Sequence, residues 1–203
     1  MAEKTRIAVL VSGGGTNLQA LIDAQNSGVL HSGEIVAVIS NKPGVYALTR
    51  AENAGIGAYV ANKKELGEKF EAEVIRIIED VKADIIILAG FMCILSENFT
   101  SRFPNRMINV HPALIPSFCG KGYYGLRVHE AALEKGVKVT GATVHFVNEV
   151  CDGGEIIAQK AVEVKDDDTP ETLQKRVMEE AEWIILPLAA EKVSARIMKQ
   201  KGE

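Results

Sequence analysis

The sequence predicts an α/β fold: a mixed, mostly parallel twisted sheet with helices on both faces and a Rossmann-like N-terminal half. Three observations support this prediction. Short apolar runs alternate with segments of helical period through the first half of the chain, an order typical of a parallel sheet covered by helices. A glycine-rich turn joins the first predicted strand to the first predicted helix. Two long extended runs in the second half are joined by a short loop, as in antiparallel neighbours.

The first half reads as strands and helices in regular alternation. The predicted strands and helices are Arg6–Val11, Thr16–Asn26 (helix), Glu34–Ser40, Tyr46–Ala54 (helix), Gly57–Ala61, Lys64–Val81 (helix) and Ala83–Gly90. The last of these strands is apolar throughout its centre, which is typical of a strand covered on both faces. The long helix before it carries apolar residues at the spacing of one helical face, namely Phe70, Val74, Ile77, Ile78 and Val81.

The pattern changes after Pro104. The predicted elements of the second half are a short strand at Met107–Val110, a helix at about Leu126–Glu134, and strands at Val137–Val147 and Glu155–Val164. Thr169 followed by Pro170 is typical of a helix start, because the hydroxyl caps the helix and proline suits its first position. We expect Pro187 to kink or end this last helix. Its inward stripe is predicted at Leu173, Val177, Ala181, Ile184 and Leu188.

Composition places the chain among ordinary globular proteins. Its 203 residues are 47% hydrophobic and 25% charged, which suits a single domain spanning residues 1–203. The net charge of −4 disfavours general nucleic-acid binding, and no apolar run approaches the ~20 residues that cross a bilayer. The apolar stretch near the N-terminus is too short for a signal peptide, and three cysteines without C-x-x-C spacing favour a reducing, cytoplasmic location.

The glycine turn at residues 12–17, SGGGTN, is a candidate phosphate site. Glycines allow positive φ and close approach of a ligand to the backbone, and the free N–H groups of a helix start suit an anion. The turn lies at the carboxyl end of a predicted parallel strand, where open α/β sheets bind ligands. It lacks a Walker lysine and the dinucleotide spacing, so a monophosphate fits better. The competing interpretation is a tight turn in which Thr16 caps the helix.

Asn109 and His111 are the candidate catalytic pair. Their i, i+2 spacing places both side chains on one face of a strand, and Pro112 ends the strand directly afterwards. An amide and an imidazole at the end of a strand could stabilise negative charge that develops on a carbonyl oxygen, and the imidazole could also carry a proton. The competing interpretation is a histidine that is buried and hydrogen-bonded for structural reasons.

Asp152 lies in a connection of the type Asp-Gly, which is also a strong turn signal. The functional hypothesis places its carboxylate beside His111, where it would raise the imidazole pKa and fix its tautomer. A Cys119 nucleophile with His111 and Asp152 is an alternative. A second alternative is a zinc site formed by histidines and cysteines, namely His111, His129, His145, Cys119 and Cys151. These residues show no compact ligand spacing, so we predict no metal. His145 itself reads as a packing residue of a strand.

Four segments of the chain resemble the folate-dependent phosphoribosylglycinamide formyltransferases, also called glycinamide ribonucleotide transformylases. They are VLVSGGGTNLQALIDA, ADIIILAGFMCILS, MINVHPALIPSF and VTGATVHFVNEVCDGGEIIAQ, and they occur in the family's order. The resemblance implies the formyltransferase fold, with a phosphate-binding half at residues 1–104 and a catalytic, folate-binding half at 105–203. It also implies transfer of the formyl group of 10-formyltetrahydrofolate to the amine of 5′-phosphoribosylglycinamide in purine biosynthesis, without a metal.

The resemblance also implies roles for individual residues. Asn109 and His111 would polarise the formyl carbonyl, and Asp152 would tune His111. The substrate would be held by Gly15, Thr16, Asn17 and Glu182. The folate would be bordered by Met92, Cys93, Ile94, Leu95, Asn109, Asn148, Glu149, Val150, Cys151 and Asp152.

The chain departs from the family pattern at several positions. Cys93 stands where the family often has arginine, and the KGYYG stretch at 121–125 is longer than in many relatives. An arginine toward the folate tail has no clear match, and Lys63 or Lys64 is a candidate replacement. A different formyl reaction on the same scaffold and a non-catalytic folate or nucleotide sensor remain open, as does the choice between monomer and homodimer.

Overall fold

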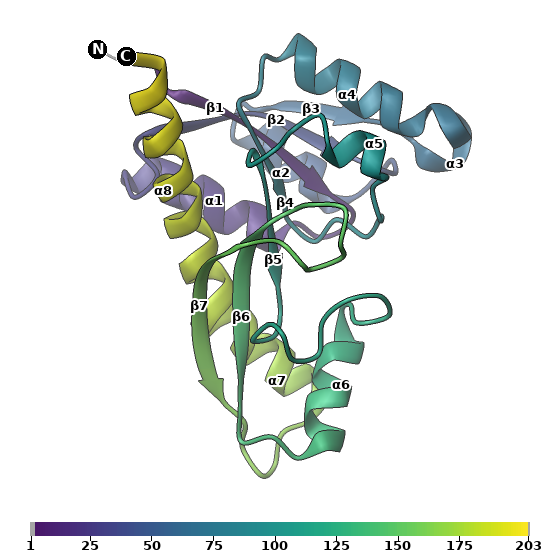
Figure 1. Ribbon diagram of the computed structural model, residues 1–203, viewed down its shortest axis with the longest axis vertical. Coiled ribbons are helices and arrows are strands. Elements are labelled where there is room, and N and C mark those ends of the chain that lie inside the picture. The colour runs from purple at the N-terminus through teal and green to yellow at the C-terminus, as the bar shows by residue number, and fades with distance from the viewer. Residues whose placement is uncertain (1–2, 203) are drawn as a thin grey trace.

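A seven-stranded sheet forms the centre of the molecule in the computed structural model, which describes residues 3–202 (Figure 1). The strands are β1 (Thr5–Val11), β2 (Gly33–Ser40), β3 (Gly57–Val60), β4 (Ile85–Leu88), β5 (Met107–His111), β6 (Val139–Phe146) and β7 (Ile156–Glu163). Their order is β3-β2-β1-β4-β5-β6-β7, with β1 to β5 parallel and β6 and β7 antiparallel. The predicted mixed, mostly parallel sheet is therefore confirmed.

Helices cover both faces of the sheet, as the alternation predicted. They are α1 (Thr16–Ser27), α2 (Tyr46–Asn53), α3 (Lys63–Leu66), α4 (Phe70–Asp80), α5 (Glu97–Thr100), α6 (Leu126–Lys135), α7 (Pro170–Val177) and α8 (Trp183–Gly202), with a 3₁₀ turn, η1 (Gly67–Lys69), and a π-helical turn, η2 (Met178–Glu182). Side chains of β1 alternate between two cores. Ile7 and Val9 pack in the core with α1, α2 and α8, whereas Ala8 and Leu10 pack with α4 and α5.

The sheet order brings three loops to one edge. Strands β1, β4 and β5 are parallel neighbours, so the glycine turn after β1, residues 89–95 after β4 and His111 at the end of β5 meet there. The antiparallel strand β6 pairs with β5 and sets Asn109 directly opposite His145. In Figure 1, β6 and β7 extend away from the parallel part, and α6 and α7 lie beside them.

The predicted helix Lys64–Val81 is wrong as a single element. The structure divides it into α3, η1 and α4, and Gly67 at the break has a φ of 54°. A residue with positive φ cannot continue a right-handed helix, so the chain restarts after it. The apolar face predicted from Phe70 onward is retained by α4, which buries Phe70, Val74, Ile77 and Ile78.

The prediction for the last helix is partly wrong. Thr169 caps α7 as expected and forms a capping box with Thr172. Pro187, however, lies inside α8 and does not end it; the interruption is the π-helical turn η2, upstream of the proline. This wider turn delays the rotation of the chain, so Ile185 and Ala189 continue the buried stripe. The predicted Ile184 and Leu188 are 43% and 52% exposed.

Candidate active site

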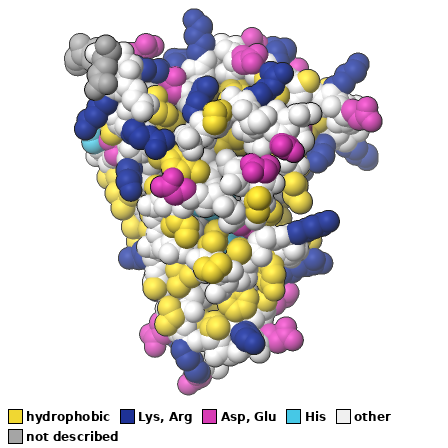
Figure 2. Space-filling view, viewed as in Figure 1, with side chains coloured by type: hydrophobic (Ala, Val, Ile, Leu, Met, Phe, Trp, Pro, Cys, Tyr) yellow, Lys and Arg dark blue, Asp and Glu magenta, His cyan; other side chains and the backbone are white. Residues whose placement is uncertain are grey.

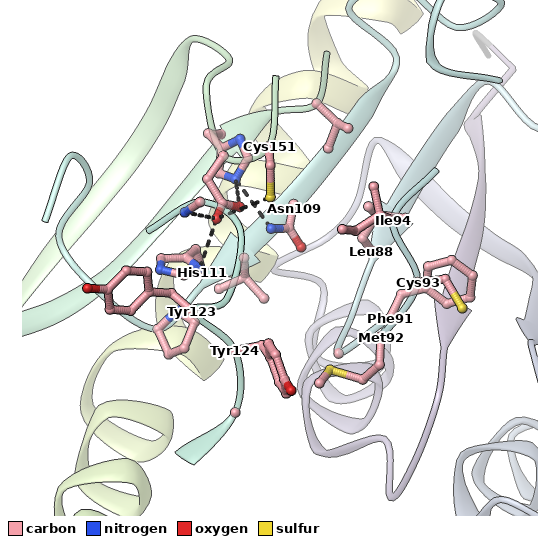
Figure 3. A pocket seen from close by; sticks show the side chains of 18 of the residues that line it. Leu88, Phe91, Met92, Cys93, Ile94, Asn109, His111, Tyr123, Tyr124 and Cys151 are labelled. Atoms are coloured by element: carbon pink, nitrogen blue, oxygen red, sulfur yellow. Dashed lines mark hydrogen bonds and ion pairs between the residues drawn. The ribbon is translucent and has the colours of Figure 1, made fainter. Parts of the chain in front are cut away.

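A cleft of about 730 Å³ opens where the parallel and antiparallel parts of the sheet meet. Figure 3 shows Asn109 and His111 on one side of it and Met92 and Ile94 on the other, and Figure 2 shows hydrophobic side chains gathered over the middle and lower part of one face of the molecule. Most of the predicted site residues line the cleft: Asn17, Met92, Cys93, Ile94, Leu95, Asn109, His111, Asn148, Glu149, Val150, Cys151, Asp152 and Glu182. Gly15 and Thr16 are not among its lining residues.

Strand pairing positions Asn109 and brings in a histidine that the sequence did not mark as functional. The Asn109 Nδ2 atom lies 3.3 Å from His145 Nε2, and His145 Nδ1 lies 2.7 Å from the carbonyl oxygen of Phe146. Because the Phe146 carbonyl can only accept, His145 Nδ1 donates to it, and Nε2 faces both Asn109 Nδ2 and, at 3.4 Å, Asp152 Oδ1. Asn109 then retains a second amide hydrogen for a ligand. The register pairing of these two residues was the signal that could have revealed His145.

Asp152 lies between the two histidines. Its Oδ2 is 3.6 Å from His111 Nδ1 and accepts a hydrogen bond from the Gly120 N–H at 2.8 Å, while its Oδ1 is 3.4 Å from His145 Nε2. The hypothesis that Asp152 lies beside His111 is thus correct in geometry. Burial opposes ionisation of this carboxyl, but the contacts from His145, Gly120 and His111 outweigh it and lower its pKa to about 2. Asp152 is therefore a carboxylate at neutral pH.

Asp152 raises the pKa of His111 as expected, but burial has a larger effect in the opposite direction. His111 is 4% exposed, and burial lowers its pKa below the usual value, although Asp152 and the Phe118 carbonyl act in the opposite direction. His111 Nε2 lies 2.8 Å from the Phe118 oxygen and so donates to it. In this state of the protein, His111 is mainly neutral at pH 7, and Asp152 makes its protonation easier than burial alone would allow.

The conformation of the glycine turn depends on its backbone and on close packing against α2, not on a side-chain cap. Gly15 has a φ of 73° and is the residue that precedes α1, so the interpretation of Thr16 as a side-chain cap is wrong. A Cβ atom at Gly15 would lie 2.7 Å from the Cβ of Ala47, which explains why the position requires glycine. In the described chain, and outside the regular helices and strands, no backbone N–H of residues 13–17 donates to another residue. These groups form an open set of donors.

Asn17 and Glu182 form a buried polar pair at the other end of the cleft. Asn17 Nδ2 donates to Glu182 Oε2 at 2.6 Å, and Glu182 is only 6% exposed. Burial raises the pKa of Glu182, whereas the bond from Asn17 lowers it. Asn17 is therefore bound through its amide to a carboxylic group, and its Oδ1 atom has no partner in the described structure. Two segments 165 residues apart thus meet at this end of the cleft.

Residues 92–95 form the apolar wall of the cleft. The Met92 N–H donates to the Ser12 hydroxyl at 2.8 Å, which fixes this segment to the glycine turn. Met92 and Ile94 are 55% and 70% exposed although both are apolar. Exposed apolar side chains gathered at one cleft mark a surface that a ligand covers. The Cys93 thiol leaves the centre of the wall and contacts the amide of Asn41 at 3.0 Å.

The alternatives to a formyl-transfer site find less support. Burial raises the pKa of the Cys119 thiol, and the nearby Asp152 raises it further, so this thiol is a poor nucleophile at neutral pH. Among residues 3–202 no group of three or more metal-binding side chains comes together. His129, one of the zinc candidates, lines the cleft, but burial lowers its pKa to about 4 and neither ring nitrogen has a partner among the described residues.

Comparison with known proteins identifies the family. The model of the formyl transferase family matches residues 5–189. Phosphoribosylglycinamide formyltransferase of Haemophilus influenzae is 41% identical over 185 residues, which are 90% of this chain and 84% of that protein. The chain belongs to the phosphoribosylglycinamide formyltransferase family. The resemblance stated from four sequence segments is thereby confirmed.

Structures and longer relatives agree with this assignment. The crystal structure of phosphoribosylglycinamide formyltransferase from Brucella melitensis superposes with a TM-score of 0.86 at 41% identity, covering 95% of this chain and 97% of that one. The human trifunctional purine biosynthetic protein adenosine-3 is 47% identical over 203 residues, or 99% of this chain. That stretch is only 19% of the human protein, so the chain spans about a fifth of the length of its trifunctional relatives.

Proposed function

We propose that the chain transfers the formyl group of 10-formyltetrahydrofolate to the amine of 5′-phosphoribosylglycinamide, a step of purine biosynthesis. The observation that carries this proposal is the cluster of Asn109, His111 and Asp152, which lines the same cleft as the apolar wall and Glu182. A folate fits the apolar wall at one end, and a cleft of 730 Å³ lies in the range of small-molecule sites. Glu182 and Asn17 line the other end, and the glycine turn directly precedes Asn17, so together they offer an acceptor and donors for a phosphorylated amine.

The cluster supports direct attack of the amine on the formyl carbon. Negative charge develops on the formyl oxygen, and the second amide hydrogen of Asn109 is placed to stabilise it. Removing one such donor typically slows an enzyme by about a hundredfold or more. As the amine loses a proton, His111 takes up positive charge, and the ionised Asp152 next to it favours that charge. The same proton can then pass to the departing folate nitrogen.

His111 must release its present partner to reach a ligand directly. Its Nε2–H is donated to the Phe118 carbonyl, and its Nδ1 faces Asp152. A shift of the loop from 118 to 125 would free Nε2, and the positive φ angles of Gly120, Gly122 and Gly125 mark where this loop turns. With the ring hydrogen on Nδ1, where Asp152 can accept it, the freed Nε2 could take up the amine proton. We therefore assign the proton transfer to His111 or to a water that it polarises.

The remaining features of the proposal concern partners and location. The substrates are small molecules, and the chain acts as a monomer or homodimer in the cytoplasm without nucleic acid or a metal. Among residues 3–202, no helix has the length and apolar character to span a membrane. The division into a phosphate-binding half at 1–104 and a catalytic half at 105–203 is part of the same proposal, since the cleft draws residues from both.

One assay tests the proposal against formyltetrahydrofolate hydrolysis. Tetrahydrofolate release is measured with and without phosphoribosylglycinamide, and the formylated ribonucleotide is identified by mass spectrometry. We expect folate deformylation only when the ribonucleotide is present, with one formylated product per folate released. Deformylation at an equal rate without the ribonucleotide would assign the chain to hydrolysis instead.

A further inference from the structure

Arg50 on α2 holds the glycine turn from the side opposite to its unpaired N–H groups. Its Nε donates to the Gly14 carbonyl oxygen at 2.8 Å, and its Nη1 donates to Gln19 Oε1, also at 2.8 Å. The guanidinium lies 4.8 Å from the centre of the Tyr46 ring, so its plane is supported as well. One side chain thus connects the turn before α1, the first turns of α1 and the start of α2.

The first turn of α2 adds a second contact to the same segment. The Ala47 N–H donates to the Gly13 carbonyl oxygen at 3.1 Å. The Ala47 side chain also lies so close to Gly15 that a Cβ atom there would approach to 2.7 Å. Helix α2 and the glycine turn are therefore packed directly against each other, and two consecutive carbonyl groups of the turn accept hydrogen bonds from α2.

These two contacts set the direction of two N–H groups. A trans peptide is planar, with its N–H opposite to its C=O. When α2 holds the carbonyl of Gly13, it turns the N–H of Gly14 away from α2. When Arg50 holds the carbonyl of Gly14, it turns the N–H of Gly15 the same way. Both N–H groups then join the unpaired donors of the first turn of α1, which an anion can bind.

We propose that Arg50 is a positioning residue for the phosphate end of the ribonucleotide substrate, acting through the Gly14–Gly15 peptide plane. The proposal rests on the proposed function for the identity of the substrate. Its geometry applies to any phosphate monoester at this turn. The guanidinium also places a positive charge next to the turn, which favours a phosphate over a neutral ligand. A lysine at position 50 separates the orienting hydrogen bonds from the charge, because lysine keeps the charge but cannot bond Gly14 and Gln19 at fixed geometry.

Kinetics of Arg50→Gln and Arg50→Lys test the positioning role. For Arg50→Gln we expect the KM for phosphoribosylglycinamide to rise about tenfold, because the variant loses a well-placed hydrogen bond and a nearby charge. We expect kcat to stay within about twofold and the KM for the folate to stay unchanged. Arg50→Lys should recover only part of this loss. Arg76→Gln, on the exposed face of α4, is the matched control and should change neither constant. Full recovery by lysine, or a KM within twofold of wild type in both variants, would overturn the proposal.

Two further measurements keep the result independent of folding and of the reaction. If Arg50→Gln melts early, Gln19→Ala removes only the partner of Nη1; we expect its KM for the ribonucleotide to rise about threefold, and no rise would refute the role. Titration with ribose 5-phosphate reports the phosphate site without turnover. Weaker ribose 5-phosphate binding in Arg50→Gln supports the inference even if the wild type transfers no formyl group, whereas equal binding rejects it even if the enzyme is active.

Discussion

The Asp152 carboxylate provides the sharpest test of the proposed chemistry, through the substitution Asp152→Asn. Asparagine keeps the shape of the side chain and an oxygen that accepts from the Gly120 N–H, but it removes the charge that faces His111 and His145. Unit charges about 4 Å apart interact by about 4 kcal/mol at an effective dielectric constant near 20. Because the amide retains a dipole, this value is an upper limit. We expect kcat to fall by about 10² to 10³, with the folded state retained.

The pH profile separates this electrostatic role from a structural one. In the wild type, Asp152 raises the pKa of His111 against the larger effect of burial. Without the carboxylate, only the Phe118 carbonyl still opposes burial, so the pKa of His111 falls further. Because neutral His111 takes up the amine proton in the proposed step, the loss of kcat with falling pH should move to lower pH in Asp152→Asn. Asp166→Asn, at an exposed pair with Lys138, is the control and should leave the profile unchanged. Activity within about threefold of wild type in Asp152→Asn would refute the reasoning.

Four further outcomes are expected. Gly15→Ala should destabilise the fold by about 2 kcal/mol and raise the KM for the ribonucleotide, because φ is positive at Gly15 and the new Cβ would meet Ala47. Gly14→Ala has open space at its Cβ and should do neither, so equal melting temperatures and KM values for the two variants would contradict this prediction. Cys119→Ser should keep at least about half of kcat, since burial leaves this thiol protonated, and loss of turnover would restore the thiol-nucleophile hypothesis. Asp168→Asn should lower the free energy of unfolding by about 1–3 kcal/mol at pH 7, because the bonds to Arg176 lower the pKa of the Asp168 carboxyl. The effect should shrink as the pH falls below about 4, and denaturant melts at pH 7 and below pH 4 check this sign. Lys121→Ala should raise the KM for 10-formyltetrahydrofolate about two- to fivefold but leave the KM for an analogue without the glutamate tail unchanged, because Lys121 is the only lysine or arginine among the described residues that line the cleft. An equal rise for both compounds would reject an ion pair between Lys121 and the tail.

Much of this fold follows from local sequence signals. The apolar runs of β1 and β2 and the period of α1 predict the parallel half to within a residue or two. The predicted helix at 64–81 is too long because apolar period alone does not reveal the positive φ of Gly67. The position of the π-helical turn before α8 is likewise set by packing against the sheet, which no local pattern encodes.

The candidate site was predictable only where its residues share a strand or a loop. The Asn109 and His111 spacing predicts a common face, and the glycine turn predicts an open helix start. The candidate role of Lys63 or Lys64 toward the folate tail stays a prediction, since both lie on α3 and outside the cleft lining. The phosphate role of Asn17 stays a prediction, and the bond from its amide to Glu182, between segments at opposite ends of the chain, could not be predicted from local sequence.

His145 shows why spatial pairing decides the chemistry of this cleft. From its own strand it reads as a packing residue, but the antiparallel register of β5 and β6 sets it opposite Asn109 and within 3.4 Å of Asp152. Its Nε2 lies 3.3 Å from the Asn109 amide nitrogen and so fixes the position of that amide, whose second N–H is left for a ligand. The parallel half of the sheet therefore supplies the Asn–His pair, and the antiparallel half orients it. This site depends on the antiparallel direction of β6. If β6 ran parallel to β5, its residues would pair with β5 in the reverse order, and His145 would not lie opposite Asn109 in this register.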